Sequence, residues 1–96
     1  MTVKIMIKRK VSKQKKNDFL QLINKLRTEV IKQPGYISGE ILNHLDDPEQ
    51  YLVISTWKSA EEWQAWKASK DRVELQAKVD GLLEEKTQYD VYRYLL

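Results

Sequence analysis

The single histidine of this 96-residue chain, His44, is the side chain best suited to acid–base chemistry. An imidazole ionises near neutral pH and could act as a general base. Asn43 precedes it and could hydrogen bond a substrate oxygen. Asp46, Asp47 and Glu49 follow, and their carboxylates with His44 are ligand types that metal ions accept. A lone histidine in an acidic turn is more often simply solvated, so we predict no metal site and leave the role of a base open.

All three tryptophans, Trp57, Trp63 and Trp66, lie within ten consecutive residues. They follow an apolar run that is typical of a buried strand, and they continue into a helical segment. Aromatic side chains gathered at such a junction often line a pocket for a small molecule. They are also the side chains that dominate ordinary cores. The sequence leaves both interpretations open, and in the first of them Ile7 joins the tryptophans as a lining residue.

Other polar groups that could reach an apolar cavity are Arg93 and the tyrosines. Such groups could remove or steady a phenolic proton of an aromatic ligand by hydrogen bonding. The commoner role of any one tyrosine is packing within a sheet or an interface. The five are Tyr36, Tyr51, Tyr89, Tyr92 and Tyr94.

The composition excludes several classes of protein. The chain has no cysteine, which rules out a disulfide scaffold, a thiolate zinc site and a cysteine nucleophile. Its length fits one domain, residues 1–96. No segment approaches the ~18 consecutive apolar residues of a membrane helix, and the start of the chain does not resemble a signal peptide. We therefore expect a cytoplasmic protein without a membrane partner.

Alternation with a period of two residues predicts the strands. The acidic residues around Pro48 are typical of a turn, so the second and third strands should form a hairpin. The predicted strands cover residues 3–9, 36–45, 51–57 and 87–95.

Two helices are expected between the strands. Ser12 can cap the first, whose apolar residues recur at three- and four-residue steps until Pro34 and the glycine after it end the helix. Ser59 and Glu62 form a capping box, in which the serine oxygen accepts a backbone N–H and the glutamate reaches back to the N–H of the serine. The second helix should therefore run from residue 59 to about residue 69.

A break is expected near residues 69–71, because Asp71 and Glu74 repeat the capping pattern. After it, Val73 and Ala77 continue a weaker apolar stripe toward Gly81. The second helical region should therefore have two parts.

The order βαββαβ predicts an α+β, ferredoxin-like fold with an antiparallel four-stranded sheet and its helices on one face. Both faces of the third and fourth strands are apolar; in residues 51–57, for example, Leu52 and Ile54 lie opposite Val53 and Trp57. An antiparallel face in contact with water should be mostly polar. We therefore predict a homodimer that buries the second sheet face.

The basic start of the chain raises the alternative of a nucleic-acid partner, because the charged residues before Asp18 are all basic. RNA-binding modules of similar topology carry a glycine–aromatic signature on a central strand. Residues 51–57 lack it, so we predict a solvated rim and no nucleic acid.

Two motifs carry a family resemblance: Pro34-Gly35-Tyr36 at the start of the second strand, and Trp57-Lys58-Ser59 between the third strand and the second helix. With them, nearly the whole chain resembles an antibiotic biosynthesis monooxygenase-type (ABM) domain. The resemblance implies a dimeric α+β barrel, in which two ferredoxin-like protomers join through their sheets. Members include cofactor-free monooxygenases of polycyclic aromatic compounds, heme-degrading monooxygenases and small proteins without an assigned role.

The resemblance transfers unevenly to single residues. In the heme-degrading members an asparagine, a tryptophan and a ligand histidine act together, and the aligned positions here are Ile7, Trp66 and Gln76. Glutamine is a poor ligand for heme iron. Other members carry histidines in and after the second helix, where this chain has Trp66 and Asp71. Heme degradation and a histidine base from that helix are therefore not expected.

Two functions remain after this comparison. The first is a small cofactor-independent monooxygenase that acts on an aromatic or quinol-like substrate. Its candidate catalytic residues are Trp66, Asn43 and His44, and its candidate lining residues are Trp57, Trp63, Trp66 and Ile7. The second is a non-catalytic dimeric barrel that binds a small hydrophobic molecule. Neither requires a cofactor or a metal.

Overall fold

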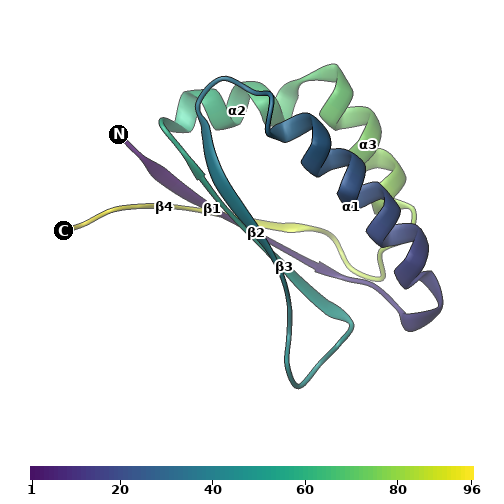
Figure 1. The fold of residues 1–96 in the computed structure, drawn as a ribbon. Helices are drawn as coiled ribbons and strands as arrows, with labels where there is room; N and C mark the ends of the chain where they lie inside the picture. Colours follow the sequence, from purple (N-terminus) through teal and green to yellow (C-terminus); the bar gives the residue numbers. More distant parts are fainter.

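A computed structural model describes residues 1–96, and it has a single four-stranded sheet with its helices packed on one side (Figure 1). A short 3-10 turn precedes the first helix. In chain order the elements are β1 (Val3–Lys10), η1 (Lys13–Lys15), α1 (Lys16–Val30), β2 (Tyr36–Asn43), β3 (Gln50–Trp57), α2 (Ala60–Ala68), α3 (Lys70–Asp80) and β4 (Gln88–Arg93).

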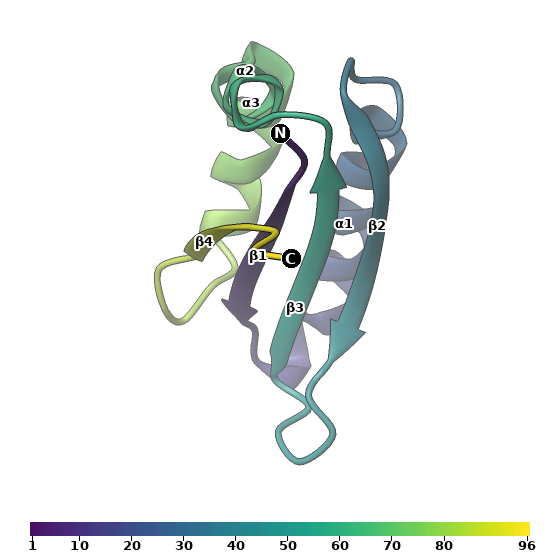
Figure 2. The ribbon, with the colours of Figure 1, turned by 90° about the vertical axis from the view of Figure 1, so that its left-hand side faces the viewer.

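The sheet has the strand order β2-β3-β1-β4, and every neighbouring pair is antiparallel. Figure 2 shows the strands side by side with α1 behind them, and the β2–β3 hairpin extending beyond the rest of the sheet. The two central strands pair along their full length, from Val3 opposite Trp57 to Lys10 opposite Gln50. This arrangement confirms the predicted ferredoxin-like α+β fold.

The hairpin between β2 and β3 differs slightly from its prediction, because β2 ends at Asn43 and not at residue 45. Beyond that point the His44 side chain organises the turn. Its Nδ1 accepts hydrogen bonds from the backbone N–H groups of Asp46, at 3.1 Å, and Asp47, at 3.0 Å. The backbone N–H of His44 still donates to the Gln50 oxygen at 3.0 Å, so His44 is the last residue that pairs across the hairpin before the turn. β4 also stops early, at Arg93.

Serines start α2 and α3, with details that correct the predicted caps. Ser59 Oγ accepts the N–H of Glu62 at 3.2 Å, as expected, but the Glu62 carboxylate accepts from the Ser59 hydroxyl and not from its backbone. The break before α3 is confirmed, and its cap is Ser69, whose Oγ accepts the N–H of Arg72. The predicted cap at Asp71 is wrong because that residue already lies inside the first turn. Ser12 makes no side-chain cap bond.

The buried face of α3 is not the one that its apolar residues predict. Val73 is 52% exposed and Ala77 is exposed, whereas Arg72, Gln76 and Val79 are buried. These three follow the four- and three-residue steps of one helix face. The prediction was wrong because two of the residues that face the sheet are polar, and their burial depends on hydrogen bonds rather than on apolarity.

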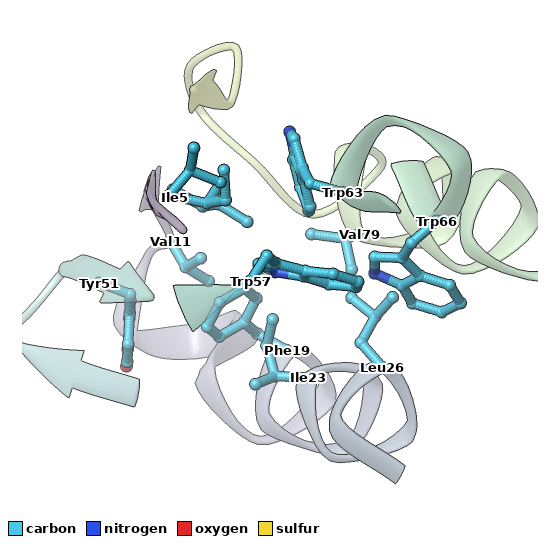
Figure 3. Close-up of a cluster of buried hydrophobic side chains, with 12 residues drawn as sticks. Ile5, Val11, Phe19, Ile23, Leu26, Tyr51, Trp57, Trp63, Trp66 and Val79 are labelled. Carbon is cyan, nitrogen blue, oxygen red and sulfur yellow. The ribbon is translucent and has the colours of Figure 1, made fainter. Parts of the chain in front are cut away.

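The hydrophobic core lies between the sheet and the helices. Trp57 is fully buried in it, between α1 on one side and the tryptophans of α2 on the other (Figure 3). Phe19, Ile23 and Leu26 form the α1 side, at the three- and four-residue spacing of an amphipathic helix. All three tryptophans are therefore core residues, whether or not they also line a pocket.

No helix covers the other face of the sheet (Figure 1). Met6, Leu52 and Ile54 point to that side, because they alternate with the buried residues of β1 and β3, and all three are half-buried. Tyr92, opposite Lys4, is 56% exposed. This open face is thus an apolar strip flanked by charged side chains. None of the helices has the length and apolarity needed to span a membrane.

Candidate functional site

A cavity of about 70 Å³ lies between the helix-covered face of the sheet and the helices. Its walls come from β1, β2 and β3 and from all three α-helices. Most of the lining residues are hydrophobic. Arg27, Glu40 and Ile41 belong to the lining and are exposed, so the cavity opens to solvent between α1 and β2.

Aromatic side chains form one wall of this cavity. Trp63 and Trp66 line it from α2, and Ile7 lines it from β1. Trp57 does not line it and is 0% exposed. Instead it supports the wall from behind, because its ring makes edge contacts with Tyr36 at 5.5 Å and with Trp63 at 5.8 Å between centroids.

The start of β2 places Tyr36 on the opposite wall. Gly35 makes this possible, since its φ of 85° lies in the left-handed region and a Cβ there would collide with the carboxylate of Glu62. Gly39 leaves room for the Tyr36 ring, because a Cβ at that position would collide with the tyrosine hydroxyl. Burial raises the pKa of Tyr36 above its usual value, against the opposing effect of Arg27, so the phenol is neutral at physiological pH.

Three arginines line the cavity. Arg27 is exposed at its opening, whereas Arg9 and Arg72 are only 4% exposed. Arg9 comes from β1, where it follows Val3, Ile5 and Ile7 on the buried side of the strand. Its Nη2 donates to the side-chain oxygen of Gln76 at 2.8 Å, and its buried Nε has no hydrogen-bond partner in the protein.

The charge of Arg9 is costly at this position. Desolvation lowers the pKa of the Arg9 guanidinium to about 10; the positive charge of Arg72 adds to this, whereas Tyr89 and Asp80 oppose it. The group nevertheless remains cationic at neutral pH. Arg9 is therefore a buried positive charge at neutral pH.

Arg72 is the second buried cation, and it comes from the first turn of α3. Its Nη2 donates to the hydroxyl of Tyr89 at 2.8 Å. The guanidinium carbon lies 5.4 Å from the centroid of Trp63 and 5.3 Å from that of Tyr89, within cation–π range of both rings. These contacts fix the guanidinium beside the tryptophan wall of the cavity.

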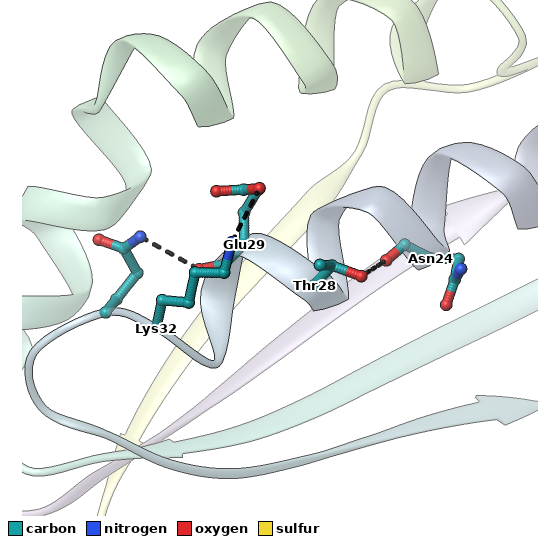
Figure 4. Close-up of polar contacts among 5 residues, drawn as sticks. Asn24, Thr28, Glu29 and Lys32 are labelled. Carbon is teal, nitrogen blue, oxygen red and sulfur yellow. Dashed lines mark hydrogen bonds and ion pairs between the residues drawn. The ribbon is translucent and has the colours of Figure 1, made fainter.

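Neither arginine has a carboxylate partner. The one ion pair of the chain joins Lys32 and Glu29 at 3.6 Å near the end of α1, far along the chain from both (Figure 4). The acceptors that hold Arg9 and Arg72 are the side-chain amide of Gln76 and the hydroxyl of Tyr89. The cavity is thus apolar with a net positive electrostatic character.

The residues of this site do not fit a heme. Gln76, which aligns with the ligand histidine of heme-degrading proteins, is held by three side chains: its oxygen accepts from Arg9, and its amide nitrogen donates to Asp80 at 2.7 Å and to Thr87 at 3.2 Å. Every polar atom of the Gln76 side chain is therefore occupied. The cavity itself is also much too small for a porphyrin.

Asn43 and His44 lie apart from this cavity, at the hairpin end of β2, and neither lines it. The Asn43 amide donates to the backbone oxygens of Pro48 and Gln50, and His44 closes the turn. Both side chains are exposed and serve the hairpin. In addition, no three His, Cys, Asp or Glu side chains lie together in a group that could hold a metal ion.

Sequence reasoning missed both arginines, although a signal existed for each. Arg9 keeps the alternation of β1 in phase with Ile5 and Ile7, which places it on the buried face. Arg72 and Gln76 are four residues apart and so share one side of α3. The charge of the arginines concealed these patterns, because a basic residue is almost never fully buried unless it is paired.

Solved structures with the same fold are numerous. A conserved protein from Methanosarcina mazei superposes with a TM-score of 0.92 at 22% identity, covering 97% of this chain and 92% of the other. A putative antibiotic biosynthesis monooxygenase from Nitrosomonas europaea gives 0.90 at 19% identity, over 98% and 90%. SnoaB, a cofactor-independent oxygenase from Streptomyces nogalater, gives 0.88 at 14% identity, over 99% and 94%. At these identities the likeness establishes the fold alone.

Curated relatives match in sequence over part of the chain. Protein SchA of Streptomyces halstedii is 33% identical over 58 residues, and a 42.8 kDa protein in the whiE locus of Streptomyces coelicolor is 32% identical over 57 residues. The matched segments cover 60% and 59% of this chain but only 15% and 14% of the relatives, which are much longer proteins. The model of the family described as "Antibiotic biosynthesis monooxygenase" matches residues 2–78. Since this match covers most of the sequence, the chain belongs to the antibiotic biosynthesis monooxygenase family.

Proposed function

We propose that the protein is a cofactor-independent monooxygenase that oxidises a small aromatic or quinol-like substrate in the cavity beside Trp66. The observation that carries this proposal is a largely apolar cavity whose lining includes two tryptophans and two buried arginines, Arg9 and Arg72. The tryptophans offer flat surfaces to an aromatic ring. The guanidiniums favour the anion that such a ring forms when it loses a proton, because a nearby positive charge lowers the pKa of an acid.

The chemistry needs no redox group from the protein. A substrate with an acidic methylene group loses a proton to give an enolate or phenolate anion, whose carbon forms a bond to one atom of O2. The resulting peroxide takes up a proton. Its O–O bond then breaks as the second C–H proton leaves, which yields a carbonyl group and water. The substrate supplies all four electrons and O2 is the oxidant, so the protein contributes stabilisation of the anion and exclusion of water.

The size of the cavity limits the substrate. Its volume of about 70 Å³ is smaller than the roughly 150 Å³ that encloses a benzene molecule in an engineered cavity. A ring must therefore extend through the opening between α1 and β2, or lining side chains must move. This favours one- or two-ring compounds over large polycyclic ones.

The test is oxidation of an anthrone-type compound and of a smaller quinol-like compound, with O2 present and no flavin or metal added. We expect turnover above the buffer rate, with one atom of labelled O2 in the product and no release of hydrogen peroxide. Trp66→Ala should lower kcat/KM at least tenfold. His44→Ala, at the exposed hairpin, is the matched control and should retain activity. Oxidation that releases peroxide, or that is unaffected by Trp66→Ala, would refute the proposal.

A second function, ligand binding without catalysis, is favoured by one observation. The cavity lining contains no histidine, the Tyr36 phenol has a raised pKa, and the one carboxylate of the lining, Glu40, is exposed at the opening, so no buried lining side chain is an evident base near neutral pH. Saturable binding of aromatic compounds without turnover across the substrate panel would support this alternative.

A further inference from the structure

The positive charge of Arg9 and Arg72 is unusual because no carboxylate lies within ion-pair distance of either guanidinium. The one acidic residue of the lining, Glu40, is exposed at the opening of the cavity. An ionised group is costly to remove from water unless it is paired, and an apolar residue of similar size is often at least as stable in its place. Yet Arg9 and Arg72 are both 4% exposed and neither has a carboxylate within ion-pair distance. Folding alone therefore gives no reason for two guanidiniums here.

The contacts of Arg9 and Arg72 fix the positions of the two guanidinium groups without neutralising their positive charges. Arg9 donates to the neutral amide of Gln76, whose other end is anchored on Asp80. Arg72 donates to the Tyr89 hydroxyl and stacks near two aromatic rings. Both guanidiniums are thus fixed before a ligand arrives, and preorganised donors bind without paying for their own ordering.

Arg9 also keeps an unused donor. Its Nε is buried and has no hydrogen-bond partner among the protein atoms, whereas the great majority of buried polar atoms have one. Of the buried side-chain nitrogen and oxygen atoms in this chain, it alone lacks a partner. A site that combines fixed cations and apolar walls matches a ligand with a hydrophobic ring and an anionic oxygen.

We propose that the cavity binds an aromatic ligand that carries an ionised oxygen group, a carboxylate or a phenolate, and that Arg9 and Arg72 supply its counter-charge. The proposal rests on the proposed use of the cavity as a ligand site and narrows its substrate class to acidic aromatic compounds. It does not require turnover, so binding alone can test it.

The first experiment compares benzoate with benzamide by titration calorimetry of the whole protein under nitrogen. The two ligands have nearly the same shape and differ in charge. We expect benzoate to bind at least tenfold more tightly, with one site per protomer. Equal affinities, tighter binding of benzamide, or no detectable binding of either at millimolar concentration would overturn the proposal.

Variants then assign the preference to the two arginines. Arg72→Met and Arg9→Met keep an unbranched side chain of similar length and remove the charge, and each should reduce the preference for benzoate at least fivefold. Arg93→Met is the matched control, because Arg93 is exposed on β4 and does not line the cavity. A preference that survives both cavity variants, or that Arg93→Met removes, would overturn the assignment. Should a cavity variant fail to fold, the ligand comparison on the unaltered protein still decides.

A nitrophenol distinguishes phenolate from carboxylate binding, since its absorbance reports its own ionisation. Bound between two cations, it should ionise at a pH lower than in free solution by about one unit. A bound nitrophenol that ionises at higher pH would exclude phenolates and leave carboxylates as the ligand class. Binding of anions without any oxidation would refute the monooxygenase proposal alone, whereas oxidation of neutral compounds without a preference for anions would refute this one alone.

Discussion

The two faces of the sheet carry side chains that their solvent exposure does not explain: a buried cation on the covered face and apolar residues on the open one. On the helix-covered face, β1 buries the cation Arg9 between apolar neighbours. On the open face, the same strand presents Met6, and β3 presents Leu52 and Ile54. A folded monomer normally does the reverse, with charges in water and apolar groups covered.

Each departure indicates a partner of different chemistry. A buried cation without a paired counter-ion in a largely apolar cavity is complementary to a small anion. An apolar strip on an uncovered sheet is complementary to another apolar strip, and a second copy of the chain supplies one through twofold symmetry. We therefore propose that the protein is a homodimer joined through its open faces, with one ligand cavity on the covered face of each protomer.

The largest expected effect concerns the packing that separates the two faces. Trp57→Ala should lower the free energy of unfolding by about 3–5 kcal/mol, because it removes a fully buried indole from the centre of the core. Denaturant titration measures this loss. Val91→Ala, at a half-exposed site on β4, should cost less than about 1 kcal/mol. A loss below about 1 kcal/mol for Trp57→Ala would mean that the covered face is not the structural core.

The open face is tested with a charge at its centre. Ile54→Lys should raise the dimer dissociation constant at least 100-fold, about 2.7 kcal/mol, because the symmetric interface would bury the lysine twice. Sedimentation measures the change. Gln64→Lys, on the exposed side of α2, is the control and should leave association unchanged. A folded monomer in the unaltered protein would refute the dimer and leave the apolar strip unexplained.

The strands and helices that form the two faces can be predicted from the sequence because they depend on local patterns. Alternation gave the strands, the glycine after Pro34 gave the end of the first helical region, and Ser59 gave the start of α2. Capping and periodicity act over a few residues, so one chain suffices to detect them. The break before α3 was also predicted from a capping pattern, although the capping residue is Ser69 and not Asp71.

The cavity was less predictable because its polar residues come from distant parts of the chain. Arg9 and Gln76 are 67 positions apart, and no local pattern shows that they meet. Trp63 and Trp66 were identified from their clustering with Trp57. That the first two line the cavity and Trp57 does not depends on how α2 packs over the end of the sheet. His44 was a candidate base because of its imidazole, but in the structure its side chain closes the turn between β2 and β3.

The polar contact that holds Arg9 gives the next effect. Gln76→Leu should lower the free energy of unfolding by about 2 kcal/mol, since it removes the hydrogen-bond acceptor of Arg9 and leaves a buried guanidinium donor unpaired. Arg9→Met should cost less than this, or should stabilise the protein, because it removes the charge as well. Thermal and denaturant unfolding of the two variants measures the contrast. A larger loss for Arg9→Met than for Gln76→Leu would show that the cation contributes to stability and needs no ligand to explain it.

The smallest effect is a pH dependence confined to the covered face. Burial raises the pKa of Tyr51, so above about pH 10 the unfolded chain loses this phenolic proton before the folded protein does. The folded state then binds more protons, and its stability must fall as the pH rises through that range. Below it both states are protonated, and the contribution of Tyr51 is constant.

Tyr51→Phe should flatten this alkaline decline while keeping the contact with Phe19, whose ring centroid is 4.7 Å away. Arg9 acts in the opposite direction, because its pKa is lowered to about 10 and its cost is relieved at higher pH. Since Arg9 is present in both proteins, the difference between their unfolding free energies at pH 9 and pH 11 isolates the tyrosine. Tyr92→Phe, on the open face, is the matched control. An identical alkaline decline in Tyr51→Phe and the unaltered protein would mean that the Tyr51 hydroxyl reaches solvent, and that the covered face is wetter at this end than at the cavity.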